Sequence, residues 1–170
     1  MVTKNYTGYT EIQLTDTELC DFYSGNSPLQ DTLNENEYLV IKDTDNRIID
    51  KYCFQNGELR KVKYPIIENK WCGKIKPRNA YQELAVDMLQ DKNSKVKLIK
   101  GVYGSGKDFL MLNQALALID KGEFQKIVYI RPNVTVANVP EIGHLKGDLN
   151  EKLNWTLGPL YDKVGGEDGV

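Results

Sequence analysis

Short apolar runs between turn-forming residues dominate the first 74 positions and predict a β-rich unit there. The run at residues 39–41 ends in a turn signal at residues 43–46, and a second run covers residues 47–55. The dipeptide Asn56-Gly57 comes next. A type I′ turn needs positive φ at both central residues, so this pair predicts a hairpin with its return strand at residues 58–64.

Two helices are predicted from their end signals as well as their apolar spacing. Thr15 and Glu18 have capping-box spacing before residues 16–24, and Gly25 stands in the usual stop position. Asn79 is a good N-cap, with Gln82 three residues later, for a helix at residues 80–90.

The pattern changes in the second half of the chain, where strands and a helix are expected to alternate. A short apolar strand is predicted at residues 96–99, a strongly apolar helix at residues 108–121, and a second strand at residues 126–130. Strand, helix and strand in this order predict a βαβ unit with parallel strands and a right-handed crossover.

Composition narrows the range of functions. The chain has 170 residues and a net charge of −2, which suits one domain with a small appendage and argues against coating nucleic acid by bulk charge. Its three cysteines stand far apart, and no signal peptide or run long enough to span a membrane is seen. We therefore expect a cytoplasmic protein without a membrane partner.

One sequence motif indicates a chemical function. Gly101, Tyr103, Gly104, Ser105, Gly106 and Lys107 belong to a Gly-x-x-x-x-Gly-Lys sequence, residues 101–107, which we call the glycine loop. Glycines let the backbone wrap closely around phosphate oxygens, and the start of the following helix adds partial positive charge. Lys107 supplies a full charge, so the loop predicts nucleotide binding.

The motif departs from its usual form at the next position, where Asp108 replaces the Ser or Thr that would ligate Mg²⁺. A carboxylate about 4 Å from a phosphate oxygen costs on the order of 4 kcal/mol at an effective dielectric near 20. Mg²⁺ accepts carboxylate ligands, however, so Asp108 could instead bind the metal. The two alternatives, exclusion of Mg²⁺ or its direct binding, stay open.

These residues, with several other segments, resemble the PhoH-family ATPases. The likeness rests on residues 75–82, the glycine loop, residues 127–132 and residues 142–152, followed by 159–162, all in the family's order and spacing. It covers residues 75–164, and residues 6–71 look similar to the β-rich segment that precedes the ATPase in PIN-PhoH proteins. No PIN nuclease is seen in the sequence, so no nuclease activity is expected.

The resemblance implies an α/β fold: part of a P-loop RecA-like core at residues 75–170, preceded by the small β-rich N-terminal unit at residues 1–74. It also implies ATP and Mg²⁺ as cofactors, homo-oligomers, and ATP hydrolysis coupled in some members to RNA unwinding. By position, Gln82 resembles an adenine-reading glutamine, although a plain helix-capping role is equally open. Arg131 resembles the family's Arg-Pro arginine, which could face a phosphate or a neighbouring subunit.

Catalysis by this chain alone is expected to be weak or absent. Hydrolysis in this fold needs an acidic residue at the end of a further apolar strand, and residues 131–164 contain no such strand. The C-terminal half of the ATPase core is therefore expected to be missing. The alternative is a non-catalytic nucleic-acid-binding or assembly module with a degenerate P-loop, whose β-rich unit contacts RNA or a partner chain. The basic stretch at residues 60–78 would contact single-stranded RNA in that case.

Overall fold

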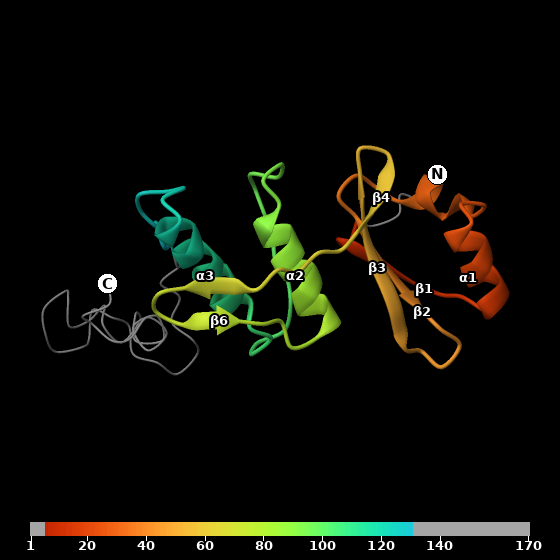
Figure 1. Cartoon of the computed structure of the whole chain (residues 1–170), viewed down its shortest axis with the longest axis horizontal. Helices are drawn as coiled ribbons and strands as arrows, with labels where there is room; N and C mark the ends of the chain where they lie inside the picture. Colours follow the sequence, from red (N-terminus) through yellow and green to blue (C-terminus); the bar gives the residue numbers. More distant parts are fainter. Residues whose placement is uncertain (1–5, 131–170) are drawn as a thin grey trace, which may run out of the picture. The chain divides into compact units, whose positions relative to one another are not determined.

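The computed structural model describes residues 6–130, and the chain there is a mixture of helices and strands (Figure 1). The described residues form two compact units, one made of residues 6–65 and 77–98 and the other of residues 66–76 and 99–130. The expected boundary at residue 74 stays a prediction. In the described residues no helix is long and apolar enough to cross a bilayer.

A four-stranded sheet forms the centre of the first unit, in the order β1-β2-β3-β4 (Figure 1). The strands are β1 (Tyr9–Gln13), β2 (Tyr38–Lys42), β3 (Ile48–Gln55) and β4 (Glu58–Lys61). β1 pairs parallel with β2, and β2, β3 and β4 pair antiparallel. The predicted hairpin is confirmed, because Asn56 and Gly57 join β3 to β4 with φ of 54° and 80°.

Alternation along β2 gives this sheet two buried faces. Leu39 and Ile41 point to one face, where they pack with residues of α1 (Asp16–Tyr23) and of a short 3-10 helix (Pro28–Thr32). Tyr38 and Val40 point to the other, where they pack with Leu84 from α2 (Ala80–Gln90). Because successive strand residues point to opposite faces, a continuous apolar run suits a strand covered on both sides.

The helix ends in this unit agree with their sequence signals. The Thr15 side chain accepts the Glu18 backbone N–H, and the Glu18 carboxylate accepts the Thr15 backbone N–H, so the capping box before α1 is complete. Gly25 follows with φ of 77°. Asn79 caps α2 by accepting the Gln82 backbone N–H at 2.9 Å.

The second unit contains a two-stranded hairpin and the helix that follows the glycine loop. β5 (Ile67–Asn69) pairs antiparallel with β6 (Gly73–Ile75), and α3 (Lys107–Asp120) packs against β5 (Figure 1). The predicted helix at residues 108–121 is confirmed, and Gly122 ends it with φ of 70°.

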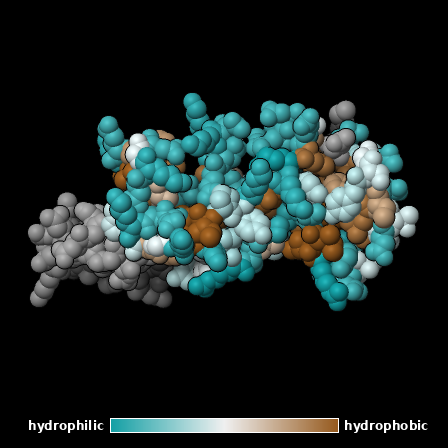
Figure 2. Space-filling view, viewed as in Figure 1, coloured by the Kyte–Doolittle hydropathy of each residue, from teal (hydrophilic) through white to brown (hydrophobic). Residues whose placement is uncertain are grey.

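The two strands predicted on either side of that helix are not formed. Residues 96–99 and 126–130 have no strand structure, so the expected parallel βαβ unit is wrong for this structure, and a RecA-like core is not established. Their apolar side chains are largely solvent-exposed, with Leu98 at 87% and Ile130 at 87%. On the face drawn in Figure 2, hydrophobic residues form separate patches within a mainly hydrophilic surface. A strand needs a neighbour to pair with, and none of the described strands pairs with these segments.

Candidate functional site

The glycine loop turns directly into α3, and two of its glycines have a backbone conformation that other residues rarely adopt. Gly104 has φ of 77° and Gly106 has φ of 86°. Left-handed φ values are costly for most residues with a Cβ atom, so these two positions favour glycine. Gly101 is constrained differently, because a Cβ there would lie 3.1 Å from the Ser105 Oγ.

The N-terminus of α3 is open to an anion. Gly106 is the N-cap, and as a glycine it has no side chain that could accept from the first N–H groups of the helix. The first N–H groups of a helix have no partner within it, and the helix dipole places partial positive charge there. Backbone donors and dipole therefore both favour a negatively charged group at this position.

The ammonium group of Lys107 lies over the loop itself. Its Nζ donates to the carbonyl oxygen of Gly101 at 2.9 Å and of Val102 at 2.7 Å, with the Ser105 Oγ at 3.4 Å. These contacts use the lysine's three donors and hold its charge against the loop backbone. A phosphate that takes the ammonium as a partner must therefore replace at least one carbonyl contact.

Asp108 lies in the first turn of α3 and is exposed to solvent. The glycine loop is also open, since Tyr103 is fully exposed and Gly104 is exposed. In the described part of the chain no group of three or more His, Cys, Asp or Glu side chains could hold a metal ion by itself. Mg²⁺ commonly uses only one or two carboxylates together with phosphate oxygens and water, and an exposed Asp108 next to the loop fits that donor set.

The other predicted site residues are not brought into this loop by any described contact. Gln82 belongs to the first unit, where its Oε1 accepts the Arg78 backbone N–H at 2.8 Å. That bond gives Gln82 a capping role at the start of α2, and a role in adenine recognition stays a prediction. Arg131 lies outside the described residues.

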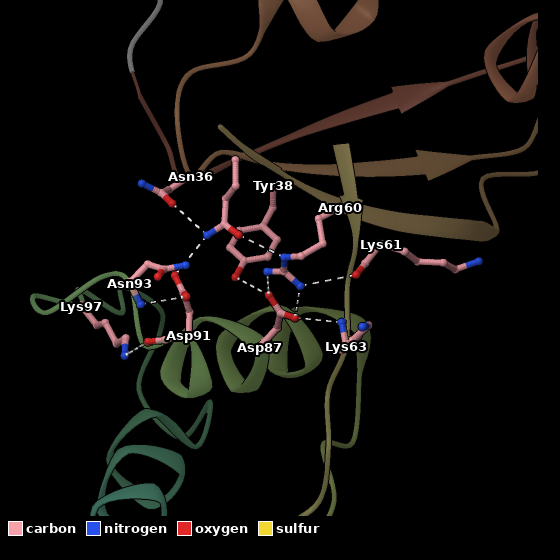
Figure 3. A network of polar contacts seen from close by, with 10 residues as sticks. Asn36, Tyr38, Arg60, Lys61, Lys63, Asp87, Asp91, Asn93 and Lys97 are labelled. Carbon is pink, nitrogen blue, oxygen red and sulfur yellow. Dashed lines mark hydrogen bonds and ion pairs between the residues drawn. The ribbon is translucent and has the colours of Figure 1, made fainter. Parts of the chain in front are cut away.

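A buried polar network that sequence analysis missed is centred on Asp87 of α2 (Figure 3). Its carboxylate accepts from both terminal nitrogens of Arg60, at 2.9 and 2.7 Å, and from the Tyr38 hydroxyl at 2.9 Å. The Lys63 backbone N–H adds a fourth bond at 2.8 Å. Burial and the nearby Asp87 charge raise the pKa of Tyr38, and the hydrogen bonds to Asp87 raise the pKa of Arg60.

One signal in the sequence could have identified this network. Asp87 stands three residues after Leu84 and directly before Met88, so it occupies the apolar face of its helix. A charged residue is almost never fully buried unless it is paired, and its place in this face therefore predicts a buried cation or set of donors.

In the basic stretch at residues 60–78, several of the positive side chains are paired with carboxylates. Besides the Arg60 pair, Lys61 lies 2.6 Å from Asp50, and Lys70 and Lys74 lie 3.9 and 4.0 Å from acidic partners. Trp71, between the hairpin strands, is 40% exposed. Most cations of this stretch thus have a carboxylate beside them, which weakens the case for a continuous positive surface.

Comparison with known proteins gives one family. The family model described as "PhoH-like protein" matches residues 74–167. Protein PhoH2 of Bacillus subtilis (strain 168) is 26% identical over 94% of this chain and 37% of its own length. Protein PhoH2 of Thermobispora bispora is 33% identical over 54% of this chain and 21% of its own length.

A further relative, the PhoH-like protein of Bacillus subtilis (strain 168), is 39% identical over 38% of this chain and 19% of its own length. The chain therefore spans between 19% and 37% of the length of these three relatives. No solved structure gives a significant match.

Proposed function

Because the chain belongs to the PhoH-like protein family, whose model matches residues 74–167, we propose that it binds ATP at the glycine loop. The observation that carries this proposal is the N-terminus of α3 with a glycine as its N-cap, in a loop with two left-handed glycines, and with the Lys107 ammonium held over the loop. Charged donors, backbone donors and a helix dipole meet there, and this combination favours a polyphosphate over a neutral ligand.

The contacts of Lys107 indicate how binding would proceed. The positive charge of the Lys107 ammonium is stabilised in part by its hydrogen bonds to the Gly101 and Val102 carbonyl oxygens. A phosphate oxygen is a stronger partner for the ammonium than a neutral carbonyl, because it carries a negative charge that attracts the positive charge of the lysine. Lys107 would therefore exchange a carbonyl for the β-phosphate, while the amides of Gly104, Ser105 and Gly106 enclose the same group.

The side chain of Asp108 determines how Mg²⁺ contributes to ATP binding. If its carboxylate ligates Mg²⁺ together with phosphate oxygens, ATP affinity rises with added Mg²⁺. If it repels the phosphates, Mg²⁺ gives no gain and Asp108→Thr strengthens binding. The exposed position of Asp108 permits both arrangements, and we favour metal ligation because it turns the repulsion into a bridge.

Calorimetry with a non-hydrolysable ATP analogue, with and without Mg²⁺, tests the proposal. Wild-type chain is expected to bind saturably, and Lys107→Ala to lose at least about tenfold in affinity, which is about 1.4 kcal/mol. Lys121→Ala, at the other end of α3, is the matched control and should leave affinity unchanged. Equal binding by the wild type and Lys107→Ala would contradict the site. No gain in the affinity of the wild-type chain on addition of Mg²⁺ would contradict metal ligation by Asp108.

ATP hydrolysis in this fold needs an acidic residue at the end of a further apolar strand. The sequence of residues 131–164 does not predict such a strand, so we expect ATP turnover by the 170-residue chain to be weak or absent. Turnover above background that Lys107→Ala abolishes would overturn this expectation. Homo-oligomers and coupling to RNA are proposed for the complete family architecture on the family resemblance alone, and the cytoplasmic location stays a prediction from the sequence.

A non-catalytic RNA-binding module is the second candidate function. One observation favours it: Trp71 is 40% exposed in the turn of the β5–β6 hairpin, beside a Lys70 side chain that is 80% exposed. An aromatic ring can stack on a base while a lysine contacts the backbone phosphate. Binding of single-stranded RNA without nucleotide, weakened by salt and by Trp71→Ala, would support this candidate. RNA binding that requires ATP would support the first.

A further inference from the structure

The β5–β6 hairpin is joined to α3 by a pair of buried asparagines. Asn69, at the end of β5, is 4% exposed, and Asn113, in the second turn of α3, is 0% exposed. The Asn69 Nδ2 donates to the Asn113 Oδ1 at 2.9 Å. The Asn113 Nδ2 in turn donates to the Phe109 carbonyl oxygen at 2.8 Å, one turn nearer the glycine loop.

The other end of this arrangement lies in the hairpin turn. The Asn69 Oδ1 accepts the backbone N–H groups of Trp71 at 3.1 Å and of Cys72 at 2.8 Å. Each side-chain nitrogen and oxygen of the two asparagines therefore has a partner. A fully satisfied buried network is rigid and tolerates few alternatives, because an unpaired polar atom in the interior is costly.

A second polar bond joins the same hairpin to the far end of the same helix. The Lys70 backbone N–H donates to the Asp120 Oδ2 at 2.7 Å, in the last turn of α3. The hairpin is thus bonded to the middle of α3 through Asn113 and to its last turn through Asp120, and of these two bonds the Asn69–Asn113 bond is the nearer to the glycine loop. The two bonds can be removed one at a time, and comparing the two losses distinguishes an effect on the glycine loop from an effect on folding alone.

We propose that Asn69, acting through Asn113, is a positioning residue for the glycine loop. The proposal rests on the proposed ATP-binding function and adds to it the element that holds the site. Asn113 bonds to Phe109, which lies two residues after Lys107, so the hairpin fixes the first turn of α3 at the point where phosphate would bind. Loss of the bond would leave Lys107 and the loop amides in place on average but free to move away from the phosphate.

Asn69→Asp isolates this bond, because a carboxylate still accepts the two turn amides but cannot donate to Asn113. Asn69→Ser is the uncharged counterpart: its hydroxyl can accept in the turn and is too short to reach Asn113. Asp120→Ala is the matched control, since it removes the bond at the far end of α3. All variants are made in the full chain and tested below their unfolding temperatures.

Two readouts are compared. Hydrogen exchange without ligand should become faster at the amides of residues 104–110 in both Asn69 variants, whereas in Asp120→Ala the faster exchange should be confined to the last turn of α3. Calorimetry with ADP and Mg²⁺ should show about tenfold weaker binding for the Asn69 variants and a change within about twofold for Asp120→Ala.

The positioning role would be overturned if amide hydrogen exchange at residues 104–110 were as slow in the Asn69 variants as in the wild type. Equal losses of ADP affinity in all three variants would also overturn it. Failure of the wild type to bind ADP would overturn the proposed function instead. In that case the exchange comparison, which needs no ligand, still decides whether Asn69 holds the loop.

Discussion

Replacing Asp87 with alanine should lower the free energy of unfolding of the first unit more than replacing any exposed residue does. The carboxylate is 3% exposed and accepts four hydrogen bonds, two from Arg60 and one each from the Tyr38 hydroxyl and the Lys63 backbone. These bonds join α2 to β2, β4 and the segment after β4, as Figure 3 shows. Asp87→Ala removes every acceptor at once.

The size of the effect depends on what is left without a partner. Removing one member of a fully buried ion pair costs about 3–5 kcal/mol. The Arg60 side chain is 34% exposed and can be hydrated in part, which lowers this figure. The Tyr38 hydroxyl and the Lys63 N–H would each lose an acceptor, and each unpaired donor in the interior would lower the stability by about 1 kcal/mol or more. We therefore expect a loss of about 3 kcal/mol.

Urea unfolding followed by far-ultraviolet circular dichroism measures this loss. Alkylation of Cys53, which is 1% exposed in the same core as Tyr38, reports on the first unit specifically. Tyr38→Phe should cost about 1 kcal/mol. Asp45→Ala is the control, because it breaks an Arg47 pair whose side chains are 76% and 65% exposed, and exposed pairs contribute little. A loss below about 0.5 kcal/mol for Asp87→Ala would refute the reasoning.

Two further predictions concern the glycine loop and the edge of the sheet. Gly104→Ala and Gly122→Ala place the same strain at φ of 77° and 70° with open space around each Cβ, so each should cost on the order of 1 kcal/mol in urea unfolding. Only Gly104→Ala should weaken ADP binding in calorimetry, and equal affinities would contradict a role for the loop. Hydrogen bonds from Lys42 and Tyr81 lower the pKa of Glu11 below its ordinary value of 4.5. The folded chain then binds fewer protons than the unfolded chain, so stability falls as pH drops through 4.5 and the lower folded pKa. Glu11→Gln should flatten this dependence in urea titrations between pH 3 and 6, and an unchanged slope would contradict it.

Local signals in the sequence predicted the local features of the fold well. The capping box at Thr15 and Glu18, the N-cap at Asn79 and the hairpin at Asn56-Gly57 all form as expected. In each case the residues that give the signal also make the hydrogen bond or adopt the dihedral angle. The glycine loop belongs to the same class, because the positive φ values of its glycines are a local property.

Features that depend on distant partners were missed or wrong. The parallel pairing of β1 with β2 joins Tyr9 to Tyr38, and no local signal marks it. The Asn69–Asn113 bond joins residues 44 positions apart. Residues 96–99 and 126–130 have the composition of strands but no pairing strand in the described part of the chain, and apolar pattern alone cannot supply one.

Nuclear magnetic resonance of ¹⁵N-labelled chain titrated with ADP and Mg²⁺ tests the central claim most directly. The proposed function predicts that the largest amide shift changes fall on residues 101–108, and that Lys107→Ala removes them at the same ligand concentrations. No saturable change, or a largest change outside this segment that Lys107→Ala leaves intact, would contradict nucleotide binding at the glycine loop.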